Sequence, residues 1–338
     1  MQVAILTEGG KKRGLGHVVR CSAIYEAFIE IGIKPVVYVD VSDKIYYKIP
    51  EFKEVNWLKN KEFLKTLEKF DIVIVDSYIA NYELYEEISS KVRIPVFLDD
   101  NARLDYPRGI VVNFSLCAEK IFENKKNESN YYLLGPQYIP IRKAFLEISK
   151  IQKDEKNRIN QIFLMFGGTD VTNLSAKVLK LLKENTFSSI KKVVVTGSRK
   201  IAFDIHQNFP DVEVLLNPDP RVLAKKMAMS DLAISAAGMT LYELAYLQIP
   251  TIAVCVADNQ RRGLYEFVNK GYLKEYLSYE DPLLLSKIRS ILHFMMDNYN
   301  KVKRKSSIGR NIVDGHGSKR LVNKLLRFYH EESIDTRR

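Results

Sequence analysis

The chain alternates short apolar runs with longer segments of helical periodicity along most of its length. The apolar runs lack the period-two alternation of half-buried strands, which is typical of parallel strands buried on both faces. Six of them precede residue 150: Val3–Thr7, Pro35–Val39, Asp71–Val75, Val96–Leu98, Ile110–Val112 and Tyr131–Leu134. Strands that alternate with helices in this way indicate a doubly wound α/β sheet.

The same alternation restarts after a charged stretch at residues 153–158, which is predicted to be a linker. The strands expected after it are Ile162–Phe166, Val193–Thr196, Val212–Leu215, Leu232–Ser235 and Thr251–Val256. Expected helices include Val18–Ile31, Asn173–Lys183 and Thr240–Leu247. The sequence therefore predicts two Rossmann-like domains, residues 1–150 and 158–315, followed by a helical tail at residues 316–338.

Composition narrows the class of protein. With 46% hydrophobic residues among 338, the chain can build two cores, and no apolar run approaches the length of roughly 20 residues that a membrane-spanning helix needs. The N-terminus runs directly into a glycine loop, so it is interpreted as a first strand and not as a signal peptide. Three distant cysteines, Cys21, Cys117 and Cys255, argue against a disulfide framework or zinc site and favour a cytoplasmic protein.

The net charge of +11 points to nucleic acid, an anionic membrane surface or a phosphate-bearing substrate as a partner. Lysines are scattered along the chain, and no RNA-recognition, helix-turn-helix or zinc-finger signature occurs. Solvated helix faces explain most of the excess, so we expect no nucleic-acid partner and no membrane insertion. Peripheral membrane contact through the basic C-terminal region, densest at residues 301–305, is the minor alternative.

The first predicted strand ends in a glycine loop that leads to a histidine. In open α/β sheets ligands bind beyond the carboxyl ends of the strands, and Gly14 and Gly16 allow a ligand to approach the backbone closely. The spacing is neither a dinucleotide fingerprint nor a P-loop. A helix N-terminus disfavours an imidazolium, so a neutral His17 can accept a proton as a general base. The alternative, that His17 only caps the helix or binds phosphate, is equally compatible with the spacing.

Three strand ends of the second domain carry small residues of the same kind. Phe166–Asp170 offers backbone N–H groups or a helix cap, and Thr196–Ser198 is placed to pass beside a base. Ser235–Thr240 leaves room for a diphosphate at a helix N-terminus. Glu243 is predicted to hold a ribose diol, or alternatively to form a capping box with Thr240.

Polar residues also close two strands of the first domain, at Asp76–Tyr78 and at Asp99–Asp100. Adjacent residues of a strand point to opposite faces, so at most one of the last two carboxylates is expected to face a ligand. The alternative is that these residues serve turn formation alone.

Taken in order, these segments resemble the UDP-sugar hydrolases of pseudaminic acid biosynthesis and the spore-coat polysaccharide biosynthesis proteins. Both are relatives of the lipid II N-acetylglucosaminyltransferase within the GT-B superfamily. The matching segments are Gly14–Cys21, Val75–Tyr78, Leu98–Asp100, Leu134–Tyr138, Phe166–Asp170, Gly238–Glu243, Asn259–Gln260 and Asp314–Arg320. Each is weak alone, whereas the ordered set is fairly specific.

The resemblance implies a GT-B-like fold, with two Rossmann-like doubly wound domains facing a cleft, and a UDP-sugar substrate. It implies that His17 and Tyr78 are the catalytic residues. Water, activated by His17 near Tyr78, attacks C1 of UDP-2,4-diacetamido-2,4,6-trideoxy-β-L-altropyranose, with no cofactor and no metal. The implied substrate-binding residues are Gly14, Gly16, Arg20, Asp76, Asp100, Gly167, Gly168, Thr169, Gly197, Gly238, Met239, Thr240, Glu243, Asn259 and Gln260.

One departure from the resemblance concerns the sugar. Many such proteins carry an Asp-Ala-Ser-like segment before the glycine loop, where this chain has Glu8-Gly9-Gly10. Three hypotheses remain: a UDP-sugar hydrolase, a GT-B glycosyltransferase that passes the sugar to an acceptor, and a non-catalytic nucleotide-sugar-binding protein. They differ in whether free sugar forms without an acceptor and whether anything turns over at all.

Overall fold

The structure, a computed structural model, describes residues 1–10, 13–42, 52–150 and 157–335. They form two units, one of Met1–Arg142 with Gly315–Arg338 and the other of Lys143–Asp314. Every strand pairing within the two sheets is parallel. The predicted class, two doubly wound parallel-sheet domains, is confirmed; the cleft between them stays a prediction.

The sheet of unit 1 has the strand order β3-β2-β1-β4-β5-β6-β7. The strands are β1 (Val3–Gly9), β2 (Val36–Val41), β3 (Phe52–Glu54), β4 (Ile72–Asp76), β5 (Ile94–Leu98), β6 (Gly109–Asn113) and β7 (Asn130–Leu134). Strands β1, β4, β5 and β6 are buried at every position, as expected for strands covered on both faces. All six predicted strands are present, and the short edge strand β3 was not predicted.

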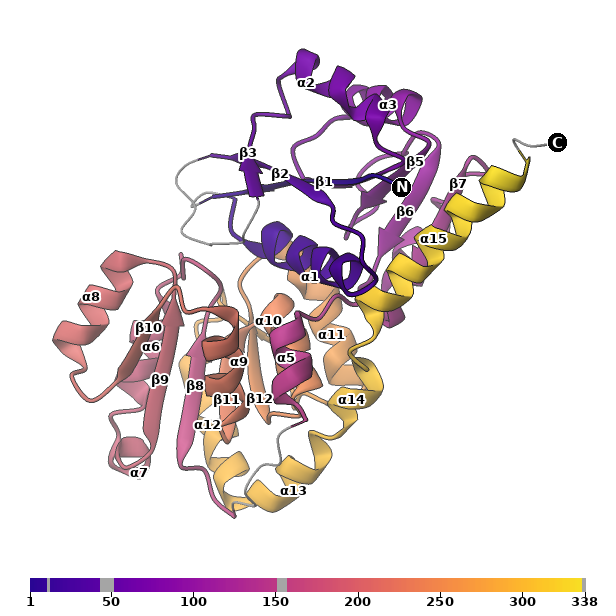
Figure 1. Cartoon of the computed structure of the whole chain (residues 1–338). Coiled ribbons are helices and arrows are strands. Elements are labelled where there is room, and N and C mark those ends of the chain that lie inside the picture. The colour runs from indigo at the N-terminus through magenta and orange to yellow at the C-terminus, as the bar shows by residue number, and fades with distance from the viewer. Residues whose placement is uncertain (11–12, 43–51, 151–156, 336–338) are drawn as a thin grey trace. The chain divides into compact units, whose positions relative to one another are not determined.

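Helices cover both faces of this sheet (Figure 1), with α2 and α3 on one side and α1 and α15 on the other. They are α1 (Gly16–Glu30), α2 (Lys61–Lys65), α3 (Tyr82–Lys91), α4 (Ala118–Phe122) and α15 (Gly317–Asp335), with 3₁₀ turns η1 (Thr66–Lys69) and η2 (Pro136–Tyr138). Gly32 follows α1 with φ of +80°, the left-handed conformation of a helix C-cap.

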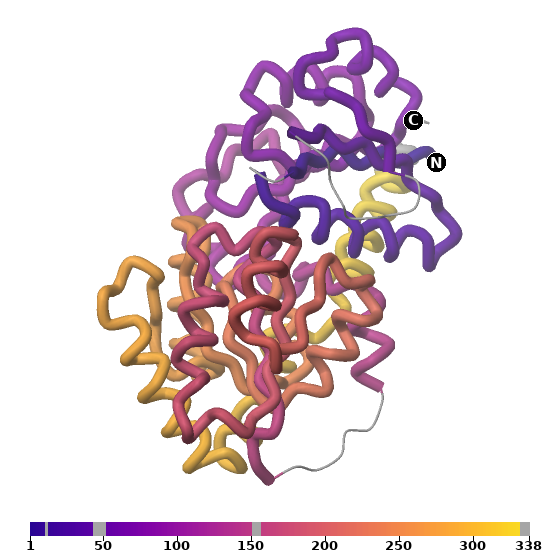
Figure 2. Tube along the Cα trace, turned by 90° about the vertical axis from the view of Figure 1, so that its left-hand side faces the viewer, coloured from indigo at the N-terminus to yellow at the C-terminus, as the bar shows by residue number. Residues whose placement is uncertain are grey.

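The last helix packs on unit 1, whereas the sequence predicted a separate tail at residues 316–338. Figure 2 shows α15 beside α1, and the two helices are in contact. The guanidinium of Arg93 lies 4.6 Å from the ring centre of Tyr329, and Arg320 donates to the carbonyl of Gln137. Residues 143–148 (α5) contact α9 and belong to unit 2, so the first unit ends before the predicted residue 150.

Unit 2 has the strand order β10-β9-β8-β11-β12-β13. Its strands are β8 (Gln161–Met165), β9 (Lys191–Thr196), β10 (Glu213–Leu216), β11 (Leu232–Ala236), β12 (Thr251–Cys255) and β13 (Leu277–Ser278). Its helices are α5 (Lys143–Ile148), α6 (Leu174–Leu181), α7 (Asn185–Ser188), α8 (Arg199–Asn208), α9 (Pro220–Ala228), α10 (Met239–Tyr246), η3 (Asp258–Gln260), α11 (Arg261–Asn269), α12 (Leu284–Asp297), α13 (Tyr299–Lys305) and α14 (Ile308–Ile312). The predicted linker lies outside the described residues except for its last two positions.

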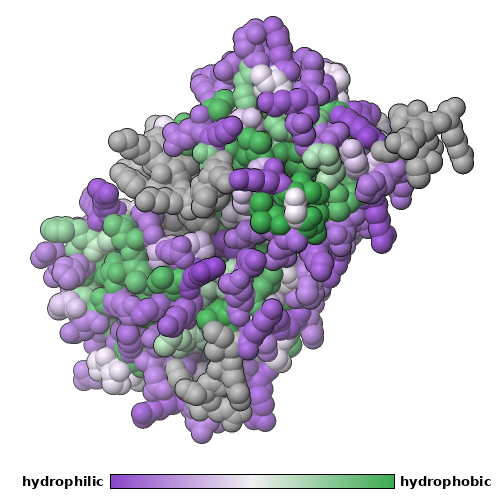
Figure 3. Space-filling model, viewed as in Figure 1, coloured by the Kyte–Doolittle hydropathy of each residue, from purple (hydrophilic) through white to green (hydrophobic). Residues whose placement is uncertain are grey.

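Each unit has its own hydrophobic core. Trp57 and Phe97 are fully buried in unit 1, and Phe187 and Ile288 are fully buried in unit 2. The indole N–H of Trp57 donates to the carbonyl of Thr7 at 2.8 Å, which satisfies the polar atom of this buried ring. Hydrophilic residues are spread over both units on the face drawn in Figure 3. Within the described residues, no helix is long and apolar enough to cross a membrane.

Candidate functional site

Polar side chains of unit 1 gather where its strand order reverses, between β1 and β4. Such switch points leave a crevice at the carboxyl ends of the two strands, where α/β proteins bind ligands. Glu8 lies near the end of β1, Asp76 ends β4, and His17 lies in the first turn of α1. We call the set formed by Glu8, His17, Arg20, Asp76, Tyr78 and Asp100 the polar cluster.

The centre of the polar cluster is a buried ion pair that also holds the histidine. Nδ1 of His17 lies 2.7 Å from Oδ1 of Asp76, and Arg20 donates to both oxygens of the same carboxylate. Asp76 is fully buried, and His17 and Arg20 are 6% and 5% exposed. His17 and Arg20 are three positions apart, so one face of α1 presents both to the end of β4.

The charges fix which atom of the histidine carries a proton. Burial alone would raise the pKa of the Asp76 carboxyl, but Arg20 and His17 hold that pKa well below its usual range. Burial also opposes charge on Arg20, yet Asp100 and Asp76 raise the pKa of its guanidinium above the ordinary value. Nη2 of Arg20, which can only donate, also lies 3.0 Å from Nδ1, but the contact of Nδ1 with the ionised carboxylate is the shorter one, at 2.7 Å. Because that carboxylate only accepts hydrogen bonds, we assign the proton to Nδ1, and a neutral imidazole then has its lone pair on Nε2.

Asp100 links the ion pair to a tyrosine. Its Oδ2 accepts from Nη1 of Arg20 at 2.5 Å and from the hydroxyl of Tyr78. The rings of Tyr78 and His17 meet edge to face with centroids 4.5 Å apart. Five predicted residues, His17, Arg20, Asp76, Tyr78 and Asp100, therefore lie together in unit 1.

Asp99, the neighbour of Asp100, bonds to the backbone of its own turn. Its two carboxylate oxygens accept from the backbone N–H groups of Asn101 and Arg103, at 2.8 and 2.7 Å. Asp99 is 2% exposed and shapes the turn after β5. The two adjacent carboxylates thus bind different partners, and the expectation that at most one of them faces a ligand stays a prediction.

Glu8 joins the cluster although no role was predicted for it. It is 1% exposed, its Oε1 accepts from the backbone N–H of Tyr78 at 2.7 Å, and the same oxygen lies 3.9 Å from Nε2 of His17. Arg13 lies 3.6 Å from Oε2 but bonds Asp40 at 2.7 Å. In the sequence, the sign of such a role was the position of Glu8, a charged residue directly after the predicted first strand, Val3–Thr7.

The glycines of the first loop leave the backbone open. Gly14 has φ of +76° and exchanges two backbone hydrogen bonds with Gly10, which closes the loop on itself. A Cβ placed at Gly14 or Gly16 would meet nothing within 4 Å. Gly14 is thus needed for its backbone conformation, whereas Gly16 is exposed and unconstrained by neighbours.

In unit 2 the sheet order reverses between β8 and β11, and predicted residues follow both strands. Gly167 has φ of +77°, and Gly168 accepts at its carbonyl from the N–H of Gly197 at 2.6 Å. Asp170, 3% exposed, accepts from the first N–H groups of α6, and Thr169 stands half-buried beside it. The N–H of Gly197 is used inside the protein, so Gly197 holds two loops together.

This contact makes Gly197 a test of loop packing. A Cβ at Gly197 would lie 2.5 Å from the carbonyl oxygen of Gly168, so Gly197→Ala is expected to reduce the free energy of unfolding by about 1–3 kcal/mol. Gly16→Ala is the matched control, because its Cβ meets no atom, and its unfolding should change by less than about 0.5 kcal/mol. Urea unfolding of both variants measures the difference; equal effects would contradict the assignment.

After β11, the helix α10 begins at Met239 with Gly238 as its N-cap residue, and no side chain caps it. Thr240 is therefore the second helical residue and not the cap, so the capping-box interpretation of Thr240 with Glu243 is wrong. Glu243 is 2% exposed, while Gly238, Met239 and Thr240 are half-buried. The uncapped N–H groups of this first turn can bind an anion.

Asn259 and Gln260 follow β12 in η3. Asn259 is exposed, and the side-chain oxygen of Gln260 accepts from the N–H of Val256 at 3.0 Å. Its amide nitrogen would lie 3.7 Å from a Cβ at Gly238. The ends of β11 and β12 thus bring Gln260 beside the start of α10.

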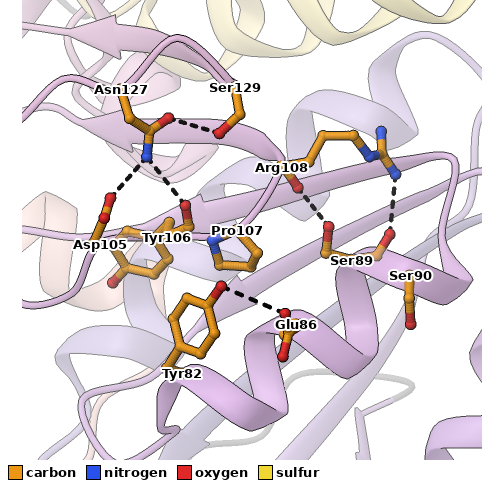
Figure 4. A pocket seen from close by; sticks show the side chains of 10 residues that line it. All are labelled: Tyr82, Glu86, Ser89, Ser90, Asp105, Tyr106, Pro107, Arg108, Asn127 and Ser129. Atoms are coloured by element: carbon orange, nitrogen blue, oxygen red, sulfur yellow. Dashed lines mark hydrogen bonds between the residues drawn. The ribbon is translucent and has the colours of Figure 1, made fainter.

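A surface hollow of unit 1, drawn in Figure 4, lies along α3 and beside the amino-terminal ends of β6 and β7. Its polar groups bond to one another: the Asn127 amide donates to Asp105 and Tyr106, and Arg108 donates to the carbonyl of Ser89. None of the predicted site residues lines it. Within the described residues, no group of three or more His, Cys, Asp or Glu could hold a metal ion.

Sequence comparison finds relatives over most of the chain, although no family model matches. The chain is 27% identical to the Helicobacter pylori protein named pseudaminic acid cytidylyltransferase and UDP-2,4-diacetamido-2,4,6-trideoxy-beta-L-altropyranose hydrolase, covering 81% of this chain and 48% of that one. It is 23% identical to the hydrolase of the same name from Campylobacter jejuni, covering 82% and 99%. It is 24% identical to the spore coat polysaccharide biosynthesis protein SpsG of Bacillus subtilis, covering 98% and 100%.

The chain spans about half the length of the Helicobacter protein, and 59% of an uncharacterized Methanocaldococcus jannaschii protein to which it is 26% identical. Among solved structures, the S. aureus MnaA–UDP co-structure has a TM-score of 0.65 at 14% identity, covering 98% of this chain and 97% of that one. Acinetobacter baumannii MurG has a TM-score of 0.61 at 13% identity, covering 97% and 100%. The chain is thus a distant homologue of proteins named as UDP-sugar hydrolases and of SpsG, and it has a GT-B-like fold.

Proposed function

We propose that the protein hydrolyses a UDP-linked amino-deoxy sugar, of the UDP-2,4-diacetamido-2,4,6-trideoxy-β-L-altropyranose type, to UDP and the free sugar. The observation that carries this proposal is the buried pairing of Nδ1 of His17 with ionised Asp76. It orients the imidazole and keeps Nε2 as the proton acceptor, as the aspartate does in serine hydrolases. The names of the relatives that cover most of this chain supply the substrate class.

The proposed step needs one base and one leaving group. The oxygen of water attacks C1 of the sugar while its proton passes to Nε2 of His17. The bond between C1 and the diphosphate oxygen breaks, and its electron pair leaves with UDP. The imidazolium that forms is stabilised by Asp76, 2.7 Å from the other ring nitrogen.

The remaining predicted residues take binding roles in this proposal. Tyr78, Arg20 and Asp100 contact the sugar, with Gly14 and Gly16 leaving the loop open to it. Backbone N–H groups at the start of α10 hold the diphosphate, which needs no metal where such donors converge. The residues proposed to bind UDP are Gly167, Gly168, Thr169, Gly238, Met239, Thr240, Glu243, Asn259 and Gln260, with Gly197 supporting their loops.

A panel of UDP-sugars incubated with the purified protein, without any acceptor, tests the proposal. We expect mass spectrometry to detect UDP and the free sugar in equal amounts for a UDP-diacetamido-trideoxy sugar, and much less for UDP-glucose. Release of UDP only when an acceptor alcohol or lipid is added would replace hydrolysis by glycosyl transfer. Binding of UDP without release from any sugar would leave a non-catalytic binding protein.

A further inference from the structure

Glu8 is a buried carboxylate that the proposed reaction has not yet used. Its Oε1 is bonded to the N–H of Tyr78, whereas Oε2 is buried and has no hydrogen-bond partner among the described residues. Among the described residues, Nη1 of Arg13 lies 3.6 Å from Oε2, beyond hydrogen-bond distance. A buried carboxylate oxygen without a donor is costly, and in native proteins such an atom usually marks a bound water, an ion or a functional role.

The second hydrogen-bond acceptor, beside the Glu8 carboxylate, is Nε2 of His17. Nδ1 of His17 is engaged by Asp76, and Nε2 lies 3.9 Å from Oε1 of Glu8. That separation is too long for a direct hydrogen bond, but it places the Glu8 carboxylate, with its unpaired Oε2, within reach of a water molecule bonded to Nε2. The two neighbouring acceptors, Nε2 of His17 and Oε2 of Glu8, can therefore share one water molecule as their donor.

We propose that Glu8 and His17 together hold the attacking water, with one O–H donated to Nε2 and the other to the Glu8 carboxylate. This inference rests on the proposed hydrolysis and deepens it. Water has two protons and satisfies both acceptors, whereas an alcohol has one proton and leaves one acceptor unpaired. Sites built for a hydrogen bond reject molecules that cannot make it, because the buried partner is then left unsatisfied. Glu8 is thus the group that selects water over an acceptor hydroxyl.

In the balanced step, the proton donated to Nε2 passes to His17 and the water oxygen bonds to C1. The second proton stays on that oxygen, bonded to Glu8, and becomes the proton of the new sugar hydroxyl. Glu8 accepts a hydrogen bond throughout and takes no proton. The C1–O bond to the diphosphate breaks with its electron pair leaving on UDP.

The test is Glu8→Gln, which keeps the size of the side chain. The amide oxygen can still accept from the Tyr78 N–H, and the NH₂ group then replaces the free acceptor Oε2 with a donor. With a UDP-sugar that the wild-type protein hydrolyses, we expect kcat to fall about 10–100-fold. UDP affinity, measured by calorimetry, should stay within about twofold, because no unit 2 residue is altered.

Competition between water and methanol as nucleophiles distinguishes the proposed role of Glu8 from a purely structural one. In buffer with added methanol, both proteins form free sugar and methyl glycoside, and their ratio reports which nucleophile is preferred. We expect the ratio of free sugar to methyl glycoside to fall about tenfold or more in Glu8→Gln. Thr7→Val, which alters the adjacent buried residue of β1, is the matched control and should keep the wild-type ratio.

These measurements distinguish a failure of the Glu8 role from a failure of the proposed function. A wild-type protein that releases UDP, combined with a Glu8→Gln protein that binds UDP and keeps both kcat and the nucleophile ratio, overturns the role of Glu8 alone. A wild-type protein that releases no UDP from any UDP-sugar overturns the proposed function, and this inference with it. A ratio that changes equally in Thr7→Val and Glu8→Gln would also overturn it, because loss of local packing then suffices.

Discussion

Replacing His17 with Asn should lower kcat for UDP release by roughly 10²–10⁴-fold, the usual contribution of a positioned general base. Asn places an amide N–H close to the position of Nδ1, so the hydrogen bond to Asp76 can be kept. It supplies nothing at the position of Nε2, so the proton acceptor is lost. Steady-state assays of UDP release, with calorimetric UDP binding on the same samples, measure the effect.

Tyr78→Phe is the matched control for His17→Asn. It keeps the aromatic ring that lies edge to face with His17 and removes only the hydroxyl that donates to Asp100. We expect a smaller loss of kcat than for His17→Asn. If His17→Asn retained more than about a tenth of the wild-type kcat, a loss below the range of general base catalysis, His17 would be a binding residue. The phosphate-binding or capping role would then be the better interpretation.

How much of this site the sequence could predict depends on which contacts are local. His17 and Arg20 lie three positions apart on a helix, and Asp76 and Asp100 follow apolar runs, so their presence at one sheet edge was predictable. Their pairing was not, because the hydrogen bonds join residues 56 to 80 positions apart. The helix N-terminus suggested a neutral His17, and only the structure shows the carboxylate that fixes its tautomer.

Glu8 shows a different limit. The predicted first strand ends at Thr7, and Glu8 begins the loop that follows it. Charged residues are mostly exposed in folded proteins, so a buried Glu8 is an exception to the rule. In the structure β1 continues to Gly9, and Glu8 is buried against the backbone of Tyr78. Functional sites often contain buried charged residues. A rule that ends a strand at the first charged residue therefore fails at such sites.

Most strands of the fold were predictable from the pattern of apolar residues. Strands buried on both faces read as unbroken apolar runs, and all eleven predicted strands are present. The two missed strands, β3 and β13, have three and two residues, too few for a pattern. The assignment of α15 to unit 1 depends on contacts with α1, about 300 positions earlier, which no local pattern reports.

Replacing Asp76 with Asn should damage both stability and catalysis. Removing Asp76 leaves the buried charge of Arg20 balanced by Asp100 alone, which costs up to about 3–5 kcal/mol of the free energy of unfolding at neutral pH. The amide also presents an NH₂ group to either Arg20 or Nδ1 of His17. When it faces Nδ1, the other tautomer is favoured, Nε2 carries the proton, and kcat should fall by about 10²–10⁴-fold.

The pH dependence of the stability difference identifies Asp76 as its source. The pKa of Asp76 is lowered on folding, so its carboxylate contributes stability at pH values above its unfolded pKa of about 3.9. That contribution is lost as the pH falls toward the folded pKa, where Asp76 becomes protonated. The difference in unfolding free energy between wild type and Asp76→Asn should therefore be constant above about pH 5 and shrink below about pH 4.

Asp99→Asn separates the two effects of Asp76→Asn. Asp99 is also a buried carboxylate at the end of a strand, but its two oxygens accept from backbone N–H groups of its own turn and not from Arg20 or His17. Its replacement should cost about 1–2 kcal/mol of stability and leave kcat within about threefold of wild type. If both variants lost kcat in proportion to stability, the histidine tautomer would not be what Asp76 controls. Loss of kcat in Asp76→Asn alone, in samples that bind UDP normally, would tie Asp76 to the proton acceptor Nε2.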